Sequence, residues 1–163
     1  MIKSKTLHLF LLITACFLTA SSFYLEFVLG LEPCVLCILQ RVLLIFLIFI
    51  YMQGVFLKQK GWLLINALAQ CVVASLGVFA SSRQIWLQTA SSVKHVTCTP
   101  GFSFLLKYGS WSDTLHALFY GTTDCSKSMG AFLGISLAQW TFLFFLGFFV
   151  CAIASFLKAR HKP

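Results

Sequence analysis

The sequence has very few charged residues. Asp, Glu, Lys and Arg make up only 10% of its 163 residues, whereas a soluble domain carries about 25%. Hydrophobic residues make up 60% of the chain, and the mean hydropathy is +0.92. These values exclude an ordinary soluble domain and place the chain in a membrane.

Two further features are missing from the chain. It has no internal repeat, no low-complexity tract and no linker of note. Long apolar runs take up most of the chain, so almost nothing remains for a separate soluble domain. None of its long apolar runs carries, at its centre, an ionisable residue of the kind that marks an ion path. The sequence therefore gives no support for the alternative function of a small transporter.

Four long apolar runs are present, and a helix needs roughly 20 such residues to cross a bilayer. We expect transmembrane helices at residues 7–25, 34–57, 62–80 and 131–157. The first run has features of a signal peptide, but it continues past Cys16 without a polar break, so we expect it to remain uncleaved. The predicted fold class is an all-α membrane protein, a four-transmembrane-helix bundle in one domain.

The basic residues predict how these helices are oriented. They precede the first run, separate the second from the third and follow the fourth: Lys3, Lys5, Lys58, Lys60, Lys158, Arg160 and Lys162. Alternating helices bring all three clusters to one side, which the positive-inside rule makes the cytoplasm. The net charge of +8 thus indicates membrane orientation and not a nucleic-acid partner. We expect cytoplasmic termini, and outer loops at residues 26–33 and 81–130, which are periplasmic if the host is a Gram-negative bacterium.

The second periplasmic loop is about 50 residues long, which favours a functional segment. Residues 112–120 have an amphipathic pattern flanked by Trp111 and Tyr120. This pattern predicts a short interfacial helix lying at the membrane surface or, equally, a loop helix packed on its own protein. Glu26 and Glu32 are expected to be boundary charges near the outer headgroups.

Cysteines carry the chemistry that the sequence indicates. Four fall on the expected periplasmic side, outside the long apolar runs or at the start of one: Cys34, Cys37, Cys98 and Cys125. The other three lie within apolar runs and are expected to be small packing residues: Cys16, Cys71 and Cys151. Disulfides persist in the periplasm. Two dithiol pairs at a membrane surface predict electron transfer between thiols and a molecule dissolved in the bilayer.

The first pair is a Cys-x-x-Cys motif preceded by Pro33, a residue that suits the first turn of a helix. In such a helix Cys34, Cys37 and Arg41 share one stripe. The positive end of the helix dipole and the Arg41 charge then favour thiolate, the species that exchanges and donates electrons. An inert pair, or half of a zinc site, is the alternative for this motif alone.

The second pair is widely spaced. A bridge between Cys98 and Cys125 would close a loop of about 28 residues and could act as a static staple that contributes roughly 3 to 4 kcal/mol. Its polar, turn-rich surroundings instead suit a disulfide that meets a partner protein. A metal-binding scaffold with all four cysteines on zinc is a further alternative, although only one pair has zinc-like spacing. Elemental analysis would discriminate between these readings.

Several motifs resemble the disulfide bond formation protein B family, the quinone-linked oxidases of the bacterial inner membrane, over nearly the whole chain. The first is Pro33-Cys34-Val35-Leu36-Cys37 followed by Gln40-Arg41. The others are Arg-Gln-Ile-Trp-Leu-Gln at 83–88, Cys98-Thr99-Pro100-Gly101, Gly-Thr-Thr-Asp-Cys at 121–125, Phe132-Leu133-Gly134 and Gln139-Trp140.

The resemblance implies a relay of disulfides. A periplasmic thioredoxin-like (DsbA-like) thiol oxidase would attack the disulfide between Cys98 and Cys125, at Cys98, and Cys125 would help to resolve the mixed disulfide. Two electrons would pass to Cys34 and Cys37. Cys37 would then react with a bound quinone, ubiquinone or menaquinone. An alternative is that the chain is a paralogue of the same family that oxidises a dedicated partner protein.

The resemblance also implies roles for nearby charged residues. Arg41 would polarise the quinone oxygen and stabilise the Cys37 thiolate, and Arg83 would assist. The alternative for both arginines is snorkelling of the side chain to the membrane interface. His95 would move protons, or be an ordinary loop histidine.

Overall fold

The protein is described from a computed structural model, which defines residues 2–28, 30, 34–56, 59–90, 131–132 and 134–160. Cys98, Cys125 and His95 lie outside the described residues, as does the helix predicted at residues 112–120.

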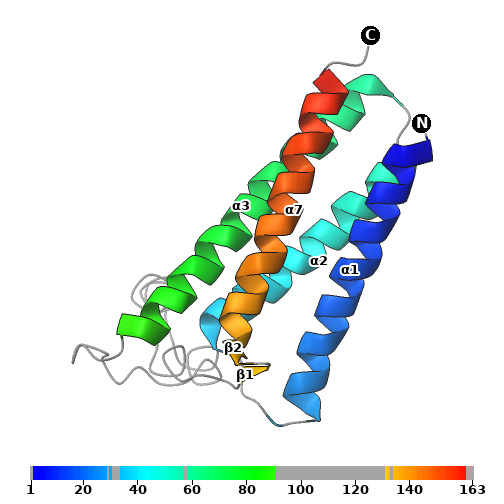
Figure 1. Ribbon diagram of the computed structural model, residues 1–163. Coiled ribbons are helices and arrows are strands. Elements are labelled where there is room, and N and C mark those ends of the chain that lie inside the picture. Colours follow the sequence, from blue (N-terminus) through cyan, green and yellow to red (C-terminus); the bar gives the residue numbers. More distant parts are fainter. Residues whose placement is uncertain are drawn as a thin grey trace, which may run out of the picture.

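The described residues form four helices that are long and apolar enough to cross a membrane. They are α1 (Ile2–Phe27), α2 (Val35–Phe56), α3 (Lys60–Ala90) and α7 (Leu137–Arg160). Figure 1 shows these helices side by side, with the start of α1 and the end of α7 at the same end of the bundle. The predicted fold class, a helical membrane protein with four spans, is confirmed.

The helices pack in chain order. α2 lies against both α1 and α3, and α3 packs most extensively on α7. The core is formed by buried side chains from all four helices: Leu11, Ala15, Leu43, Leu44, Leu47, Tyr51, Ala74, Phe145 and Phe148. A cavity described below lies where α1 and α7 face each other.

The contact between α3 and α7 depends on a glycine. A Cβ atom at Gly77 would lie 2.1 Å from the ring of Phe145, which is only 1% exposed. Small residues allow helices to approach closely in membranes, where dispersion contacts replace the hydrophobic effect as the main source of association. Because Gly77 has no side chain, the Phe145 ring can pack directly against α3 at this position.

Polar side chains join α2 and α3 near the end where α1 starts. Asn66 Nδ2 donates to the carbonyl oxygen of Ile50 at 2.9 Å, and Gln70 Nε2 donates to Asn66 Oδ1 at 2.6 Å. Polar groups inside a bilayer need such partners because no water is available to them. The bond to Ile50 therefore helps to hold these two helices in register, and Gln70, which also lies on α3, holds the Asn66 amide in place.

α3 continues to Ala90, whereas the apolar run predicts that this helix ends at residue 80. The polar composition of residues 81–90 is typical of a loop, but the segment contains neither Gly nor Pro. Ser81 and Thr89 each donate a hydroxyl hydrogen bond to the carbonyl oxygen four residues earlier, which satisfies them within the helix. Residues expected in a loop are therefore helical.

A short hairpin precedes α7, where the apolar run predicts helix from residue 131. β1 (Ala131–Phe132) and β2 (Ile135–Ser136) pair antiparallel, with Phe132 opposite Ile135. Gly134, directly before β2, has a φ of 79°, a positive value that glycine adopts without strain.

A capping box explains why α7 begins at Leu137. The backbone N–H of Gln139 donates to Ser136 Oγ at 3.3 Å, and the backbone N–H of Ser136 donates to Gln139 Oε1 at 2.9 Å. These reciprocal bonds satisfy backbone donors at the helix start. The Ser-x-x-Gln spacing is typical of such a helix start, and the prediction from the apolar run alone does not take it into account.

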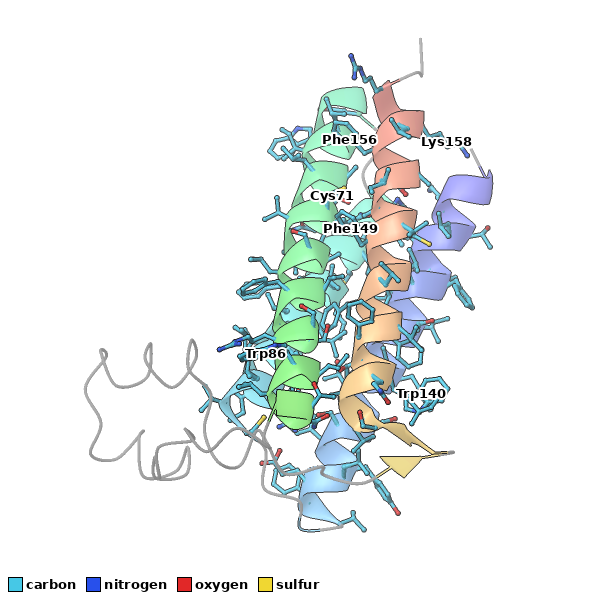
Figure 2. The ribbon with its side chains drawn as sticks, turned by 60° about the vertical axis from the view of Figure 1, so that its left-hand side comes forward. Cys71, Trp86, Trp140, Phe149, Phe156 and Lys158 are labelled. Carbon is cyan, nitrogen blue, oxygen red and sulfur yellow. The ribbon has the colours of Figure 1, made fainter. Side chains whose placement is uncertain are left out.

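Side chains at the two ends of the bundle differ in kind. Figure 2 shows Trp86 of α3 and Trp140 of α7 toward one end, and Lys158 of α7 near the other. Tryptophan is enriched at membrane interfaces, and lysine follows the cytoplasmic ends of spans. The candidate site lies at the tryptophan end.

Candidate redox site

Cys34 lies directly before α2 and caps it. Its carbonyl oxygen accepts the backbone N–H of Ile38 at 3.0 Å, and its Sγ accepts the backbone N–H of Cys37 at 3.3 Å. An N-cap residue is one whose side chain accepts such a bond from the first turn of the helix. Cys34 and Cys37 therefore lie at the positive end of the α2 dipole.

The two sulfur atoms of this pair are adjacent. Cys34 Sγ and Cys37 Sγ lie 2.8 Å apart, with Cys34 buried and Cys37 half-buried. Cys37 lines a cavity, whereas Cys34 is not among the described residues that line it. Cys37 is thus the member of the pair that a molecule in the cavity would reach.

Gln84 of α3 contacts the same sulfurs. Its Nε2 atom lies 3.2 Å from Cys37 Sγ and 3.9 Å from Cys34 Sγ, and its Oε1 accepts a hydrogen bond from Gln40 Nε2 at 2.8 Å. Both glutamine side chains are buried. In the sequence they stand out only as parts of family motifs, which assign neither of them a role. The sequence offers no reason to place Gln84 beside the cysteine pair, because it predicts a loop at residues 81–130.

Arg41, on the next turn of α2, is held by α1. Its guanidinium donates to the carboxylate of Glu26 and, at 2.9 Å, to Ser22 Oγ. It also lies 4.3 Å from the centre of the Phe23 ring. The Glu26 side chain is 27% exposed. Its expected place as a boundary charge near the headgroups stays a prediction.

A cavity of about 370 Å³ lies beside Cys37, between α1 and α7. We call it the α1–α7 cavity. Its walls are mostly apolar side chains, among them Phe17, Leu18, Leu25, Leu44, Trp140, Phe144 and Phe145. Its polar lining includes Ser22, Glu26, Cys37, Gln40, Arg41, Gln84 and Gln88. An apolar pocket with a few convergent polar groups is typical of small-molecule sites.

Arg83 lies on the same turn of α3 as Gln84 but has different surroundings. Its guanidinium carbon is 4.3 Å from the centre of the ring of Trp86, which is exposed. Arg83 is not among the described residues that line the α1–α7 cavity. The role at the quinone that the resemblance implies for Arg83 stays a prediction.

The remaining candidate residues divide into two groups. Cys98, Cys125 and His95 lie outside the described residues, so their pairing and roles stay predictions. Cys16, Cys71 and Cys151 lie within helices, and Cys151 packs against the core. Among the described residues, no three His, Cys, Asp or Glu side chains gather as a metal site would require.

The fold and the site define a multi-pass helical membrane protein with a cysteine pair at a helix start, beside a cavity inside the bundle. Comparison with known proteins gives the family. Residues 4–155 match the family model described as Disulfide bond formation protein DsbB, and the chain belongs to this family.

Curated relatives agree with this assignment. The Disulfide bond formation protein B of Marinobacter nauticus is 35% identical over 153 residues, 90% of this chain and 87% of the relative. That of Nitrosococcus oceani is 33% identical over 124 residues, 76% and 73% of the two chains. That of Methylococcus capsulatus is 35% identical over 132 residues, 80% of each.

The family membership and the four spans together establish the broad function. The protein is a multi-pass protein of the bacterial inner membrane and an oxidoreductase that acts in disulfide bond formation. The family resemblance given by the sequence motifs is confirmed.

Proposed function

We propose that the protein oxidises the active-site dithiol of a periplasmic thioredoxin-like, DsbA-like oxidase and passes the two electrons to a membrane quinone. The observation that carries this proposal is the position of Cys37 in the wall of the α1–α7 cavity, inside the membrane bundle. An acceptor dissolved in the bilayer has access to such a site.

The lining of the cavity fits a quinone head group. Most of it is apolar and suits a ring, while the Arg41 guanidinium and the side-chain amides of Gln40, Gln84 and Gln88 offer donors to carbonyl oxygens. When bound, a quinone supplies a two-electron acceptor that becomes a quinol. The chain's own residues bind the ring, exclude water and hold the cysteine pair beside it.

The relay is balanced in electrons and protons. A partner thiolate attacks the Cys98–Cys125 disulfide at Cys98, and the second partner thiolate releases the oxidised partner. The loop dithiol then reduces the Cys34–Cys37 disulfide by the same exchange. The resulting Cys34–Cys37 dithiol returns to a disulfide as two electrons and two protons pass to the quinone.

Among the described residues that line the cavity, Arg41 is the one cation. A fixed positive charge beside the cavity stabilises negative charge that develops on a quinone oxygen, and a water-poor site strengthens this effect. The ion pair with Glu26 keeps the guanidinium in place. Its role is therefore electrostatic, with no covalent step.

The orientation proposed for the chain puts the site in the periplasm and both termini in the cytoplasm. Support comes from Lys158 and Arg160, which lie in the last turn of α7 at the end of the bundle opposite the cysteine pair. The loop that carries Cys98 and Cys125 would then face the oxidising compartment.

An anaerobic assay tests the proposed function. Purified protein is mixed with a reduced thioredoxin-like periplasmic oxidase and a soluble quinone, and quinone absorbance is followed alongside the partner's thiols. Stoichiometric loss of both, abolished by Cys37→Ser and by Cys98→Ser but retained in Cys16→Ser, is expected. Partner oxidation without quinone loss would show that the acceptor is misassigned. No change in either would refute the relay.

A further inference from the structure

We propose that Gln84 is a catalytic residue of this site, whose side-chain amide stabilises the Cys37 thiolate, and that Gln40 is the positioning residue that orients this amide. The inference deepens the proposed function, since it concerns the reactivity of the same cysteine pair. It rests on a hydrogen-bonded chain that joins α2 and α3 through Gln40, Gln84 and the two sulfurs.

The amide nitrogen of Gln84 lies close to both sulfur atoms of the cysteine pair. Gln84 Nε2 lies within hydrogen-bond reach of Cys37 Sγ, at 3.2 Å, and close to Cys34 Sγ, at 3.9 Å. A primary amide carries two N–H donors, and a thiolate only accepts. A single side chain can therefore support negative charge on Cys37, with Cys34 within its reach.

The Gln84 amide is held in one orientation by Gln40. A glutamine could present either its NH2 group or its carbonyl oxygen to a sulfur atom. Here Gln40 Nε2 donates to Gln84 Oε1 at 2.8 Å, so the oxygen is already bonded and the NH2 group faces the cysteines. The opposite orientation would place a partial negative charge against the thiolate. Gln40 thus selects the productive orientation without touching Cys37 itself.

Both glutamines are buried, and burial strengthens their hydrogen bonds. Gln40 is 4% and Gln84 is 5% exposed, so water does not readily replace either donor. A hydrogen bond to a charged group is stronger in such surroundings than in water, and an unpaired buried amide is costly. The pair of glutamines is therefore a fixed part of the site.

The charged groups near Cys37 do not supply the same interaction. Arg41 and Glu26, which line the same cavity, are bonded to each other, so each reduces the field that the other exerts on the thiolate. Cys34 is the neighbouring titratable group, and its sulfur accepts the Cys37 backbone N–H. Gln84 adds a neutral, directional donor on the other side of the sulfur pair, from a different helix.

The test measures the alkylation of Cys37 in reduced, purified protein, without quinone or partner. Iodoacetamide modification is followed by mass spectrometry of the Cys37 peptide over a range of pH. Gln84→Met keeps the length of the side chain and removes the donor. The rate at neutral pH is expected to fall about tenfold, and the pH profile should move to higher pH.

The positioning role of Gln40 has its own variant. In Gln40→Met the side chain keeps its length but no longer donates to Gln84 Oε1, so the Gln84 amide loses the bond that directs its NH2 group toward Cys37. Slower alkylation is expected, in the same direction as for Gln84→Met. The control is Gln53→Met, the same substitution at an exposed position on the same helix, where the profile should not change.

The outcomes are decisive for each residue. An unchanged profile in Gln84→Met would overturn the role of Gln84, and an unchanged profile in Gln40→Met would overturn the positioning role of Gln40. Thermal unfolding in micelles identifies any variant that fails to fold, and Gln84→Asn, which keeps the amide but shortens its reach, then takes the place of Gln84→Met. Because alkylation needs no quinone, a failed relay in the anaerobic assay would leave this result intact.

Discussion

The guanidinium of Arg41 on α2 is bonded to the carboxylate of Glu26 on α1, beside the cavity that also contains the Cys37 sulfur. Ser22 accepts from the same guanidinium, and the Phe23 ring lies against it. The Arg41 side chain is only 12% exposed. It is therefore anchored within the protein, in contrast to an arginine that snorkels to the interface.

This arrangement predicts a selective defect in Arg41→Ala. Quinone reduction should slow by about a hundredfold to a thousandfold, the range found when a fixed donor to developing negative charge is removed. Formation of the mixed disulfide with the partner oxidase should change little. Stopped-flow measurement of the two steps checks this prediction, and Arg41→Lys should be intermediate because it keeps the charge but loses the planar fork. Equal loss of both steps would contradict the assigned role.

Glu26→Gln should behave differently from Arg41→Ala. It keeps an acceptor for the guanidinium but removes the opposing charge, so quinone reduction should be retained or faster. In the Arg41→Ala background the same change removes an unpaired, half-buried carboxylate, and about tenfold of the lost rate should return. The double-mutant cycle measures this coupling. Additive effects would mean that the ion pair has no influence on the reaction.

Gly77→Ala tests the contact between α3 and α7. The added methyl group would lie 2.1 Å from a Phe145 ring atom, so the helices must separate or the buried ring must move. We expect a loss of roughly 1 to 3 kcal/mol in the free energy of unfolding, measured in micelles. Gly147→Ala on α7 is the matched control, because no described atom outside the local helix backbone lies within 4 Å of the position that its methyl group would take.

The four spans and the Cys-x-x-Cys pair at a helix start could be predicted from the sequence. Apolar runs of this length indicate the spans directly, because a helix satisfies its backbone groups within a single segment of the chain. The spacing of Cys34, Cys37 and Arg41 follows from helical periodicity along a single segment. Such features depend on residues that are close together in the chain.

The partners of these residues could not be predicted in the same way. Glu26 reaches Arg41, and Gln84 reaches Cys37, across interfaces between helices whose relative rotation depends on packing. Spacing along the chain contains no measure of that rotation. Gln84 was further concealed by the polar composition of residues 81–90, which is typical of a loop although the segment is helical.

The orientation in the membrane can be tested with fusions at the C-terminus. Lys158 and Arg160 in the last turn of α7 predict that this end is cytoplasmic. A green fluorescent protein fused after residue 163 should therefore fluoresce, and alkaline phosphatase at the same position should be inactive. The reverse pattern would place the cysteine pair on the cytoplasmic side.

Cys34 has a structural role that can be separated from its redox role. Its sulfur accepts the backbone N–H of Cys37 at 3.3 Å, as an N-cap side chain does. In reduced protein, where no disulfide contributes, Cys34→Ser should keep the unfolding free energy of the wild type because serine is a good cap. Cys34→Ala should lose about 0.5 to 2 kcal/mol. Both variants should lose disulfide transfer, so activity alone does not distinguish them. Equal stability of the two variants in micelles would show that the sulfur does not contribute to the start of α2.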